Sequence, residues 1–256
     1  MTDPAVTLRL KDVSKTFGIV NVVDSISFDV KAGESVGLVG PNGAGKTTLF
    51  NCVCGQLQND HGAVYFEDQP LNGMPTYRRA RLGIGRTYQR TEVFPDMTVR
   101  NHLLVAERVH SGTGRLWKDL LNMSKPTKEE IEVSDRVMDL VGLMELADTP
   151  VAALGLGHCR LVELARALAG EPTLLLADEP SSGLDERETA AMSAVLRTVQ
   201  RERGTAILLV EHDLEMVSEV VDRVVVMDLG SKVAEGTFDE VMANPAVRYA
   251  YLGESA

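Results

Sequence analysis

The sequence predicts an α/β fold in which a parallel sheet carries helices on both faces and a helical segment is inserted into that core. Three observations support this fold class. Short apolar runs alternate with helical stretches in the second half of the chain, as is typical of a buried parallel sheet. A glycine-rich segment stands between an apolar run and a helical stretch nearer the N-terminus. Mostly helical periodicity, from about Thr98 to Leu146, interrupts the alternation.

The N-terminal part of the chain predicts mostly strands around one helix. The first two strands are expected to run as a meander, because turn residues punctuate short apolar segments. The glycine-rich turn separates a third strand from the helix. The predicted elements are the strands Leu8–Phe17, Ser25–Val30 and Ser35–Val39, a helix from Gly45 to about Gln56, and the strands Ala63–Glu67 and Ile84–Tyr88.

The middle of the chain predicts helices, and the second half predicts alternating strands and helices. Apolar residues recur at helical spacing in Thr98–His110 and Lys128–Val141. Between them, Ser111–Pro126 predicts a loop-rich insertion with a short helix around Trp117. The later elements are the strands Thr173–Ala177, Ala206–Val210 and Arg223–Met227 and the helices Glu186–Arg203 and Leu214–Val220.

Composition and charge argue against several classes of protein. With 37 acidic and 26 basic residues among 256, the chain has a formal net charge of −11, which disfavours a dedicated nucleic-acid binder because phosphate neutralisation needs clustered Lys and Arg. No apolar stretch reaches the length of a membrane span, and we expect no signal peptide. The three cysteines form no disulfide framework, so we expect a reducing, cytosolic setting with Cys52 and Cys54 as small buried helix residues.

The sharpest motif is the glycine-rich turn, which fits the pattern G-x-x-x-x-G-K-[ST] between a strand and a helix. Glycines let the backbone curl so that its N–H groups point at phosphate oxygens, and the following helix adds its positive end. The Lys46 ammonium is expected to reach the β- and γ-phosphates, and the Thr47 hydroxyl to ligate Mg²⁺. The predicted nucleotide-binding residues are Gly40, Pro41, Asn42, Gly43, Ala44, Gly45, Lys46, Thr47 and Thr48.

Polar side chains follow three more of the predicted strands. Asp178 and Glu179 end an apolar strand, at the sheet edge where open α/β sheets bind ligands. Asp178 is suited to holding Mg²⁺ and Glu179 to acting as general base toward water, although an acidic pair in this position is commonly a helix cap. Gln89 and His212 follow two other strands, so the same edge is expected to collect them. Three other histidines are interpreted as ordinary surface or core residues: His61, His102 and His110.

Taken in order, these motifs resemble the ATP-binding subunit of an ABC transporter, from about Leu8 to Gly253. The matching positions are Phe17 (the aromatic residue that stacks on adenine), Gly40–Thr48 (Walker A), Gln89 (Q-loop), Gly155, Leu156, Gly157 and His158 (signature motif), Leu174–Glu179 (Walker B), Asp185 (D-loop) and His212 (H-loop). The resemblance implies ATP and Mg²⁺ as ligands. It implies catalytic roles for Lys46, Gln89, Glu179 and His212, and metal ligation by Thr47, Gln89 and Asp178.

The resemblance also implies an architecture. A single ABC ATPase domain is expected to span residues 1–256, with a RecA-like P-loop NTPase core, an N-terminal antiparallel β-subdomain and an inserted α-helical subdomain. The core with its β-subdomain is expected at 1–89 and 166–236. The helical and signature subdomain is expected at 90–165, and a C-terminal tail at 237–256.

Several stretches are similar to the ATPases of branched-chain amino-acid importers in particular. They are Phe50-Asn51-Cys52, Arg86-Thr87-Tyr88-Gln89, Met97-Thr98-Val99, Asn244-Pro245 and Ala250–Glu254. This similarity implies an ATP-hydrolysing subunit that powers import of branched-chain amino acids or a similar small polar solute. The alternatives are a system for urea or amide import or lipopolysaccharide export, or a weakly hydrolysing regulatory subunit.

The signature motif departs from the family pattern. Gly155 stands at the usual serine position and His158 at the usual glutamine position. One hydrogen bond to a charged group contributes about 1.5–3 kcal/mol, so the site completed by Gly155 is expected to be weakened by one to two decades but not inactive. In a heterodimer, the site that uses this chain's own Walker residues is therefore expected to be the more active one.

The resemblance implies partners, because family members work as head-to-tail pairs. A second ATP-binding subunit in a homodimer or heterodimer, two permease subunits and an extracytoplasmic solute-binding protein are expected, with no nucleic acid. The chain is expected to be soluble when isolated and to sit on the cytoplasmic face of the membrane. Arg90–Val99 is expected to lie near the permease-docking groove. Its apolar residues Val93, Phe94 and Met97 either line that groove or pack inside the helical subdomain. An ABC ATPase without a membrane partner is disfavoured by the acidic composition.

Overall fold

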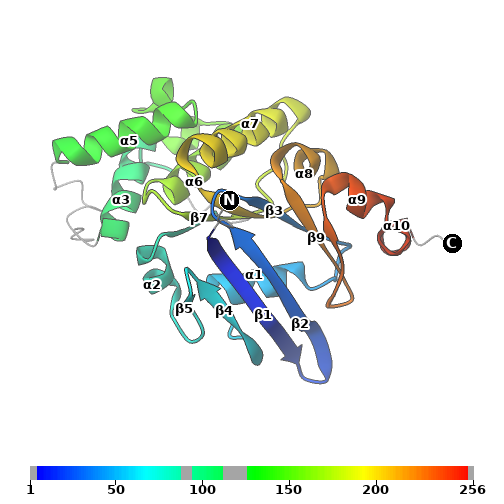
Figure 1. Cartoon of the computed structure of the whole chain (residues 1–256). Helices are drawn as coiled ribbons and strands as arrows, with labels where there is room; N and C mark the ends of the chain where they lie inside the picture. The colour runs from blue at the N-terminus through cyan, green and yellow to red at the C-terminus, as the bar shows by residue number, and fades with distance from the viewer. Residues whose placement is uncertain (1–4, 88–93, 112–125, 253–256) are drawn as a thin grey trace.

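Two sheets form the framework of the chain (Figure 1), for which a computed structural model describes residues 5–87, 94–111 and 126–252. The smaller sheet is antiparallel and has the order β2-β1-β4-β5, with β1 (Val6–Phe17), β2 (Val20–Lys31), β4 (His61–Phe66) and β5 (Gln69–Pro70). The larger sheet has the order β10-β9-β3-β8-β7-β6, with β3 (Ser35–Val39), β6 (Ile84–Arg86), β7 (Leu174–Asp178), β8 (Ala206–Val210), β9 (Arg223–Asp228) and β10 (Ser231–Gly236). Its neighbours pair in parallel except β9 and β10.

Helices cover both faces of the larger sheet (Figure 1). They are α1 (Lys46–Cys54), α2 (Thr76–Arg81), α3 (Val99–Ser111), α5 (Lys128–Leu140), α6 (Leu156–Leu168), α7 (Glu186–Arg203), α8 (Leu214–Val220), α9 (Phe238–Ala243) and α10 (Pro245–Leu252), with short 3₁₀ turns at Met144–Leu146 and Val151–Ala153. Capping boxes begin three of them, at Thr127 (α5), Asp185 (α7) and Thr237 (α9). In each, the cap side chain accepts the backbone N–H of a glutamate three residues on, and that glutamate's carboxylate accepts the backbone N–H of the cap residue.

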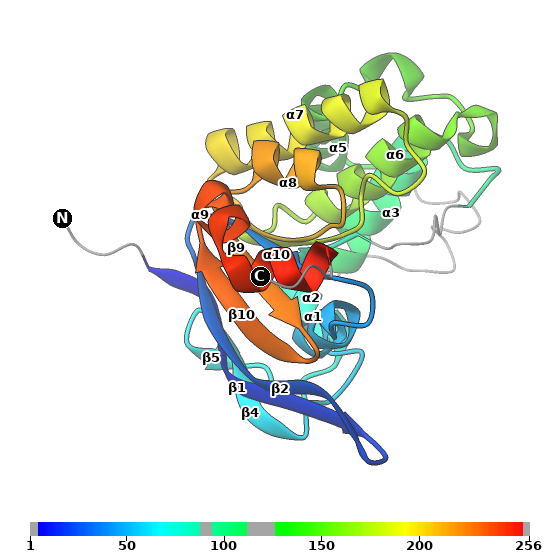
Figure 2. The ribbon, with the colours of Figure 1, turned by 90° about the vertical axis from the view of Figure 1, so that its right-hand side faces the viewer.

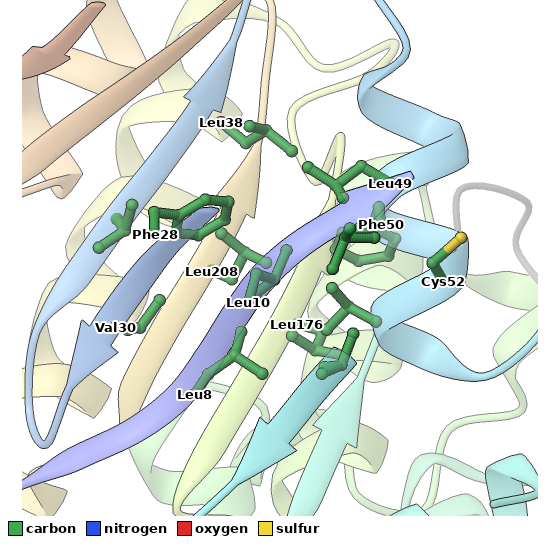
Figure 3. Packing of buried hydrophobic residues seen from close by; sticks show 14 of the residues in the cluster. Leu8, Leu10, Phe28, Val30, Leu38, Leu49, Phe50, Cys52, Leu176 and Leu208 are labelled. Carbon is green, nitrogen blue, oxygen red and sulfur yellow. The ribbon is translucent and has the colours of Figure 1, made fainter. Parts of the chain in front are cut away.

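Alternate residues of the central strands belong to two different cores. In β7, Leu174 and Leu176 pack with α1 and the antiparallel sheet in one cluster (Figure 3). Leu175 and Ala177 pack with the helical layer of α5, α6 and α7 in the other. Because side chains alternate along a strand, a run such as Leu174–Ala177 must be apolar throughout, which is the pattern that the sequence shows.

The predicted strands and helices occur within a few residues of their expected bounds, but the C-terminal segment holds more structure than the sequence indicated. β10, α9 and α10 were not expected as elements. Val241 and Val247 from these two helices pack on Val39 and Val226 of the sheet, and Figure 2 shows α9 and α10 against β9 and β10. Residues 237–252 are therefore packed helices rather than a simple tail.

The expected subdomain boundary and the expected insertion are not seen in the structure as the sequence analysis gave them. The expected boundary between residues 165 and 166 falls inside the continuous helix α6, so the helical region is joined to the core through an unbroken element. The insertion expected at Ser111–Pro126 and its short helix around Trp117 lie almost wholly outside the described residues.

Candidate functional site

The glycine-rich loop joins β3 to α1 at the carboxyl end of the parallel strands. Gly43 and Gly45 have φ values of +85° and +95°, in the left-handed region that favours glycine. A Cβ on Gly40 would lie 2.1 Å from the carbonyl oxygen of Met227, and one on Gly45 would lie 2.3 Å from that of Val22. The loop therefore fits tightly between β9 and β2, while Gly43 itself is exposed, which leaves its backbone open to a ligand.

Lys46 opens α1 and holds its ammonium within the loop. Its Nζ donates to the carbonyl oxygens of Gly40 at 2.6 Å and Pro41 at 3.1 Å. Burial lowers the pKa of Lys46, and the nearby Glu179 carboxylate partly opposes that shift. A partly desolvated cation among backbone amides is an anion-binding arrangement, so the structure agrees with a phosphate-binding role for Lys46.

Asp178 ends β7 and is nearly buried, with 6% of its surface exposed. Its backbone N–H donates to Thr87 Oγ1 at 3.1 Å, and its Oδ2 lies 3.8 Å from Arg86 Nη2. Burial raises the pKa of Asp178, and Arg86 partly opposes the rise. A desolvated carboxylate is stabilised by a cation. This oxygen donor, with the exposed hydroxyl of Thr47, is of the kind that Mg²⁺ prefers, so these residues fit the metal.

Arg86 is a member of this cluster that the sequence analysis did not single out for the site. It lies at the end of β6, and its Nη2 also donates to Asn51 Oδ1 of α1 at 3.3 Å. Its guanidinium lies 5.3 Å from the centre of the Phe50 ring, within cation–π range. Arg86 therefore connects the end of β7 with α1.

Glu179 begins the segment after β7 with an uncommon backbone conformation. Its φ is +46°, a region that non-glycine residues seldom adopt. Its N–H donates to the carbonyl oxygen of Val210 at 2.9 Å, and its carbonyl accepts from Ser182 at 3.1 Å. These two bonds hold the turn in place, because a strained backbone persists only when its surroundings fix it. The side chain is close enough to Lys46 to affect its pKa.

His212 follows β8, beside the segment that carries Glu179. Its side chain is 60% exposed, and its Nδ1 lies 3.8 Å from Glu211 Oε2. The backbone bond from Glu179 to Val210 joins the ends of β7 and β8. The structure thus brings Lys46, Asp178, Glu179 and the His212 segment to one sheet edge, as the strand-end argument predicted.

Phe17 ends β1 at the tip of the β1–β2 hairpin and is 48% exposed. Lys15 Nζ lies 5.5 Å from the centre of its ring. The same hairpin contributes Val22, whose carbonyl oxygen is packed against Gly45. An exposed ring on the hairpin that borders the loop is in a suitable place to stack on a base, but its role stays a prediction.

The signature residues lie at the start of α6, in the helical layer (Figure 1). Gly155 is the N-cap of α6, without a side-chain cap bond. Gly157 is buried, and a Cβ there would lie 2.4 Å from Glu188 Oε1. Asp185 caps α7 by accepting the Glu188 N–H at 2.9 Å, so it has a structural role besides the expected one. His158 is exposed.

The structure does not bring every predicted residue together. Among the described residues, no hydrogen bond or ion pair joins Gly155–His158 to the loop of residues 40–48. The expected contact of the signature residues with a partner's nucleotide stays a prediction. Gln89 lies outside the described residues, so its catalytic and metal roles stay predictions.

Comparison with known proteins identifies the family. A model of the ABC transporter family matches residues 23–182, which include the glycine-rich loop, β7 and Glu179. The chain belongs to the ABC transporter family. The predicted family and its ATP-binding, ATP-hydrolysing activity are therefore confirmed. A second model, described as branched-chain amino acid ATP-binding cassette transporter, matches residues 231–256, where β10, α9 and α10 form the unexpected C-terminal structure.

Relatives cover almost the whole length of this ABC ATPase. The high-affinity branched-chain amino acid transport ATP-binding protein LivG of Escherichia coli is 36% identical over 97% of this chain and 98% of its own. The corresponding protein BraF of Pseudomonas aeruginosa is 33% identical, with the same coverage of both chains. A crystal structure of an ATP-binding cassette of an ABC transporter in its ADP conformation superposes with a TM-score of 0.86 at 29% identity, covering 97% of this chain and 99% of that one. The expected ABC ATPase fold is confirmed.

None of the helices in the described ranges is long and apolar enough to cross a lipid bilayer.

Proposed function

We propose that this chain is the ATP-hydrolysing subunit of an importer for branched-chain amino acids or a similar small polar solute. Support comes from the names of LivG and BraF and from the branched-chain model over residues 231–256. The substrate pathway itself belongs to other subunits. Urea or amide import and lipopolysaccharide export are the alternatives that the sequence motifs leave open.

The observation that supports hydrolysis is the placement of a buried cation and two carboxylates on one sheet edge. The loop amides and the Lys46 ammonium would bind the β- and γ-phosphates. Glu179 would hold the attacking water as general base, and His212 would contact the γ-phosphate from the next strand end. Thr47 and Asp178, with Gln89 as the further predicted ligand, would hold Mg²⁺, which neutralises charge on the phosphates when bound.

The test of this mechanism is Glu179→Gln, which keeps the size of the side chain and removes the base. We expect ATP turnover to fall at least about 100-fold, since general-base catalysis contributes 10²–10⁴-fold, while MgATP still binds in calorimetry. Glu186→Gln, an exposed glutamate in the first turn of α7, is the matched control and should leave turnover unchanged. Unchanged turnover in Glu179→Gln, or no MgATP binding by the wild-type chain, would overturn the mechanism.

The signature motif supports a head-to-tail pair as the working form. Gly155 offers no hydroxyl to a partner's γ-phosphate, but the start of α6 still presents backbone N–H groups and positive potential. In a heterodimer, the site built from this chain's Walker residues and the partner's signature would be the faster one. Loss of most turnover when Glu179→Gln is placed in this subunit of the assembled transporter would support that asymmetry.

A groove between α2, α3 and α6 supports docking of a permease subunit at the cytoplasmic face of the membrane. It encloses about 260 Å³, and Phe94 and Met97, two of the three residues named from the sequence, line it together with Val105 and Val109. The third, Val93, lies outside the described residues. Arg86 lines the same groove, so one side chain contacts both the Asp178 region and the proposed docking surface. An extracytoplasmic solute-binding protein would complete the system.

A further inference from the structure

Glu211 is a wholly buried carboxylate beside the proposed catalytic residues. It follows Val210, the last residue of the apolar strand β8, and stands directly before His212, with 0% of its surface exposed. Its Oε1 accepts the backbone N–H of Ser181 at 2.9 Å. Its Oε2 accepts the N–H groups of His212 at 3.0 Å and Asp213 at 3.3 Å. Each oxygen therefore bonds a different segment of the chain.

Burial of this charge requires compensation, and backbone groups provide most of it. A carboxylate taken out of water is unfavourable unless it is hydrogen-bonded, and bonds from N–H groups to a carboxylate are stronger than neutral ones. His212 Nδ1 lies 3.8 Å from Glu211 Oε2, which is longer than the bonds from the backbone N–H groups. The carboxylate is therefore held chiefly by the two backbone segments that it connects.

These two segments carry the proposed base and the proposed histidine. Ser181 follows Glu179 by two residues, and the Glu179 N–H independently bonds Val210, the residue before Glu211. We propose that Glu211 is a positioning residue that clamps the Glu179–Ser181 turn to the His212–Asp213 turn and so fixes the geometry between Glu179 and His212. This inference rests on the proposed function.

The two oxygens make glutamine a selective probe. Glu211→Gln keeps the length and volume of the side chain, but its amide group is a donor and cannot accept an N–H. One of the two segments therefore loses its bond. Glu211→Asp keeps the charge and both acceptors on a shorter side chain, so it should recover part of the function.

The control neutralises a carboxylate that accepts a backbone N–H at the other end of the same sheet. Asp222 Oδ2 accepts the N–H of Ser35 at 2.9 Å, at the start of β3. Asp222→Asn therefore perturbs a carboxylate-to-backbone bond far along the strands from the site. With the purified full-length chain, kcat and KM for MgATP and the thermal unfolding midpoint are measured for every variant.

We expect Glu211→Gln to lower kcat about 10- to 100-fold, since small misplacements of catalytic groups cost up to about 100-fold, with KM within about twofold of wild type. Glu211→Asp should have a kcat between those of the wild type and Glu211→Gln, and Asp222→Asn should keep the wild-type kcat. In a His212→Ala background, Glu211→Gln should lower kcat less than about threefold, because residues that act as a unit are not additive.

The outcomes separate this inference from the proposed function. Unchanged kcat in Glu211→Gln, a full additional loss in the His212→Ala background, or failure of both Glu211 variants to fold would overturn the clamp, while Glu179→Gln could still abolish turnover. A wild-type chain that binds no MgATP would overturn the proposed function and the clamp together.

Discussion

His102 is a buried histidine whose two ring nitrogens both face the backbone. Its Nδ1 lies 3.0 Å from the carbonyl oxygen of Thr98, and its Nε2 accepts the N–H of Phe94 at 2.9 Å. A neutral ring with its proton on Nδ1 satisfies both partners, and a protonated ring cannot accept from Phe94. The sequence analysis interpreted His102 as an ordinary surface or core residue; its 2% exposure puts it in the core, where the ring also holds a residue of the proposed docking groove.

Burial lowers the pKa of His102 below its ordinary value of 6.5, which makes stability depend on pH. The unfolded chain takes up this proton at a higher pH than the folded chain. The contribution of neutral His102 to the free energy of unfolding is therefore fully present above about pH 6.5, and it is lost as the pH falls toward the pKa of the folded chain. We expect the urea midpoint of the wild type to fall below pH 6.5 more steeply than that of His102→Gln. His61→Gln, at an exposed site, should follow the wild type, and parallel curves for all three would contradict the prediction.

The two signature glycines should respond oppositely to a side chain. Gly155 has φ −71° and open space around its Cβ position, whereas a Cβ on Gly157 would displace Glu188 from the capping box of α7. We expect Gly155→Ser to add a few tenths of a kcal/mol through N-capping and to raise turnover of the dimer about tenfold through the restored phosphate contact. Gly157→Ala should lower the unfolding free energy by about 1 kcal/mol. Calorimetry and phosphate release check both, and equal effects of the two substitutions would contradict the assignment of Gly155 to the N-cap.

At the scale of elements, α1 is held at both ends by cations. Lys46 binds the loop carbonyls at its start. Arg79, from α2, donates to the carbonyl oxygens of Cys52 and Val53 at its end and to those of Leu71 and Met74 beyond it. A guanidinium suits the last carbonyls of a helix, which lack the next turn's N–H groups as donors. Burial lowers the pKa of Arg79 and raises that of the neighbouring Cys54 thiol to about 12.

Removal of Arg79 should therefore destabilise the chain more than removal of its neighbour. Arg79→Met leaves four carbonyl oxygens without this donor, and we expect the free energy of unfolding in urea to fall by about 3 kcal/mol, since an unsatisfied buried polar group costs about 1–3 kcal/mol. The control Arg78→Met, at an exposed position on the same helix, should cost less than about 0.5 kcal/mol. Similar losses in the two variants would show that the guanidinium bonds contribute little.

Central strands were predictable because both of their faces are buried, which leaves an apolar run bounded by turn residues, as in β7 and β8. β10 was missed because it is an edge strand with no fully buried residue, so it lacks that signal. The loop, Asp178 and Glu179 were located from local pattern alone. Glu211 and Arg86 were not recognised as functional, because their partners Ser181 and Asn51 come from distant parts of the sequence and meet only in the folded chain.

At the scale of the whole molecule, the larger sheet separates two interiors. One lies between the parallel strands, α1 and the antiparallel sheet, and the other lies among the helices that carry the signature motif. Figure 2 shows the two layers on opposite sides of the same strands. The nucleotide loop belongs to the first side and α6 to the second, so a head-to-tail partner would meet both sides of this chain.

Because adjacent residues of β7 point into opposite cores, the backbone of this strand is shared by the two cores. A displacement of the helical layer that packs on Ala177 would therefore move the same backbone that carries Leu176 and, one residue after Ala177, Asp178. A movement of the helical layer imposed by a membrane partner would thus be transmitted to Asp178 through the backbone of one strand, with no hinge between them.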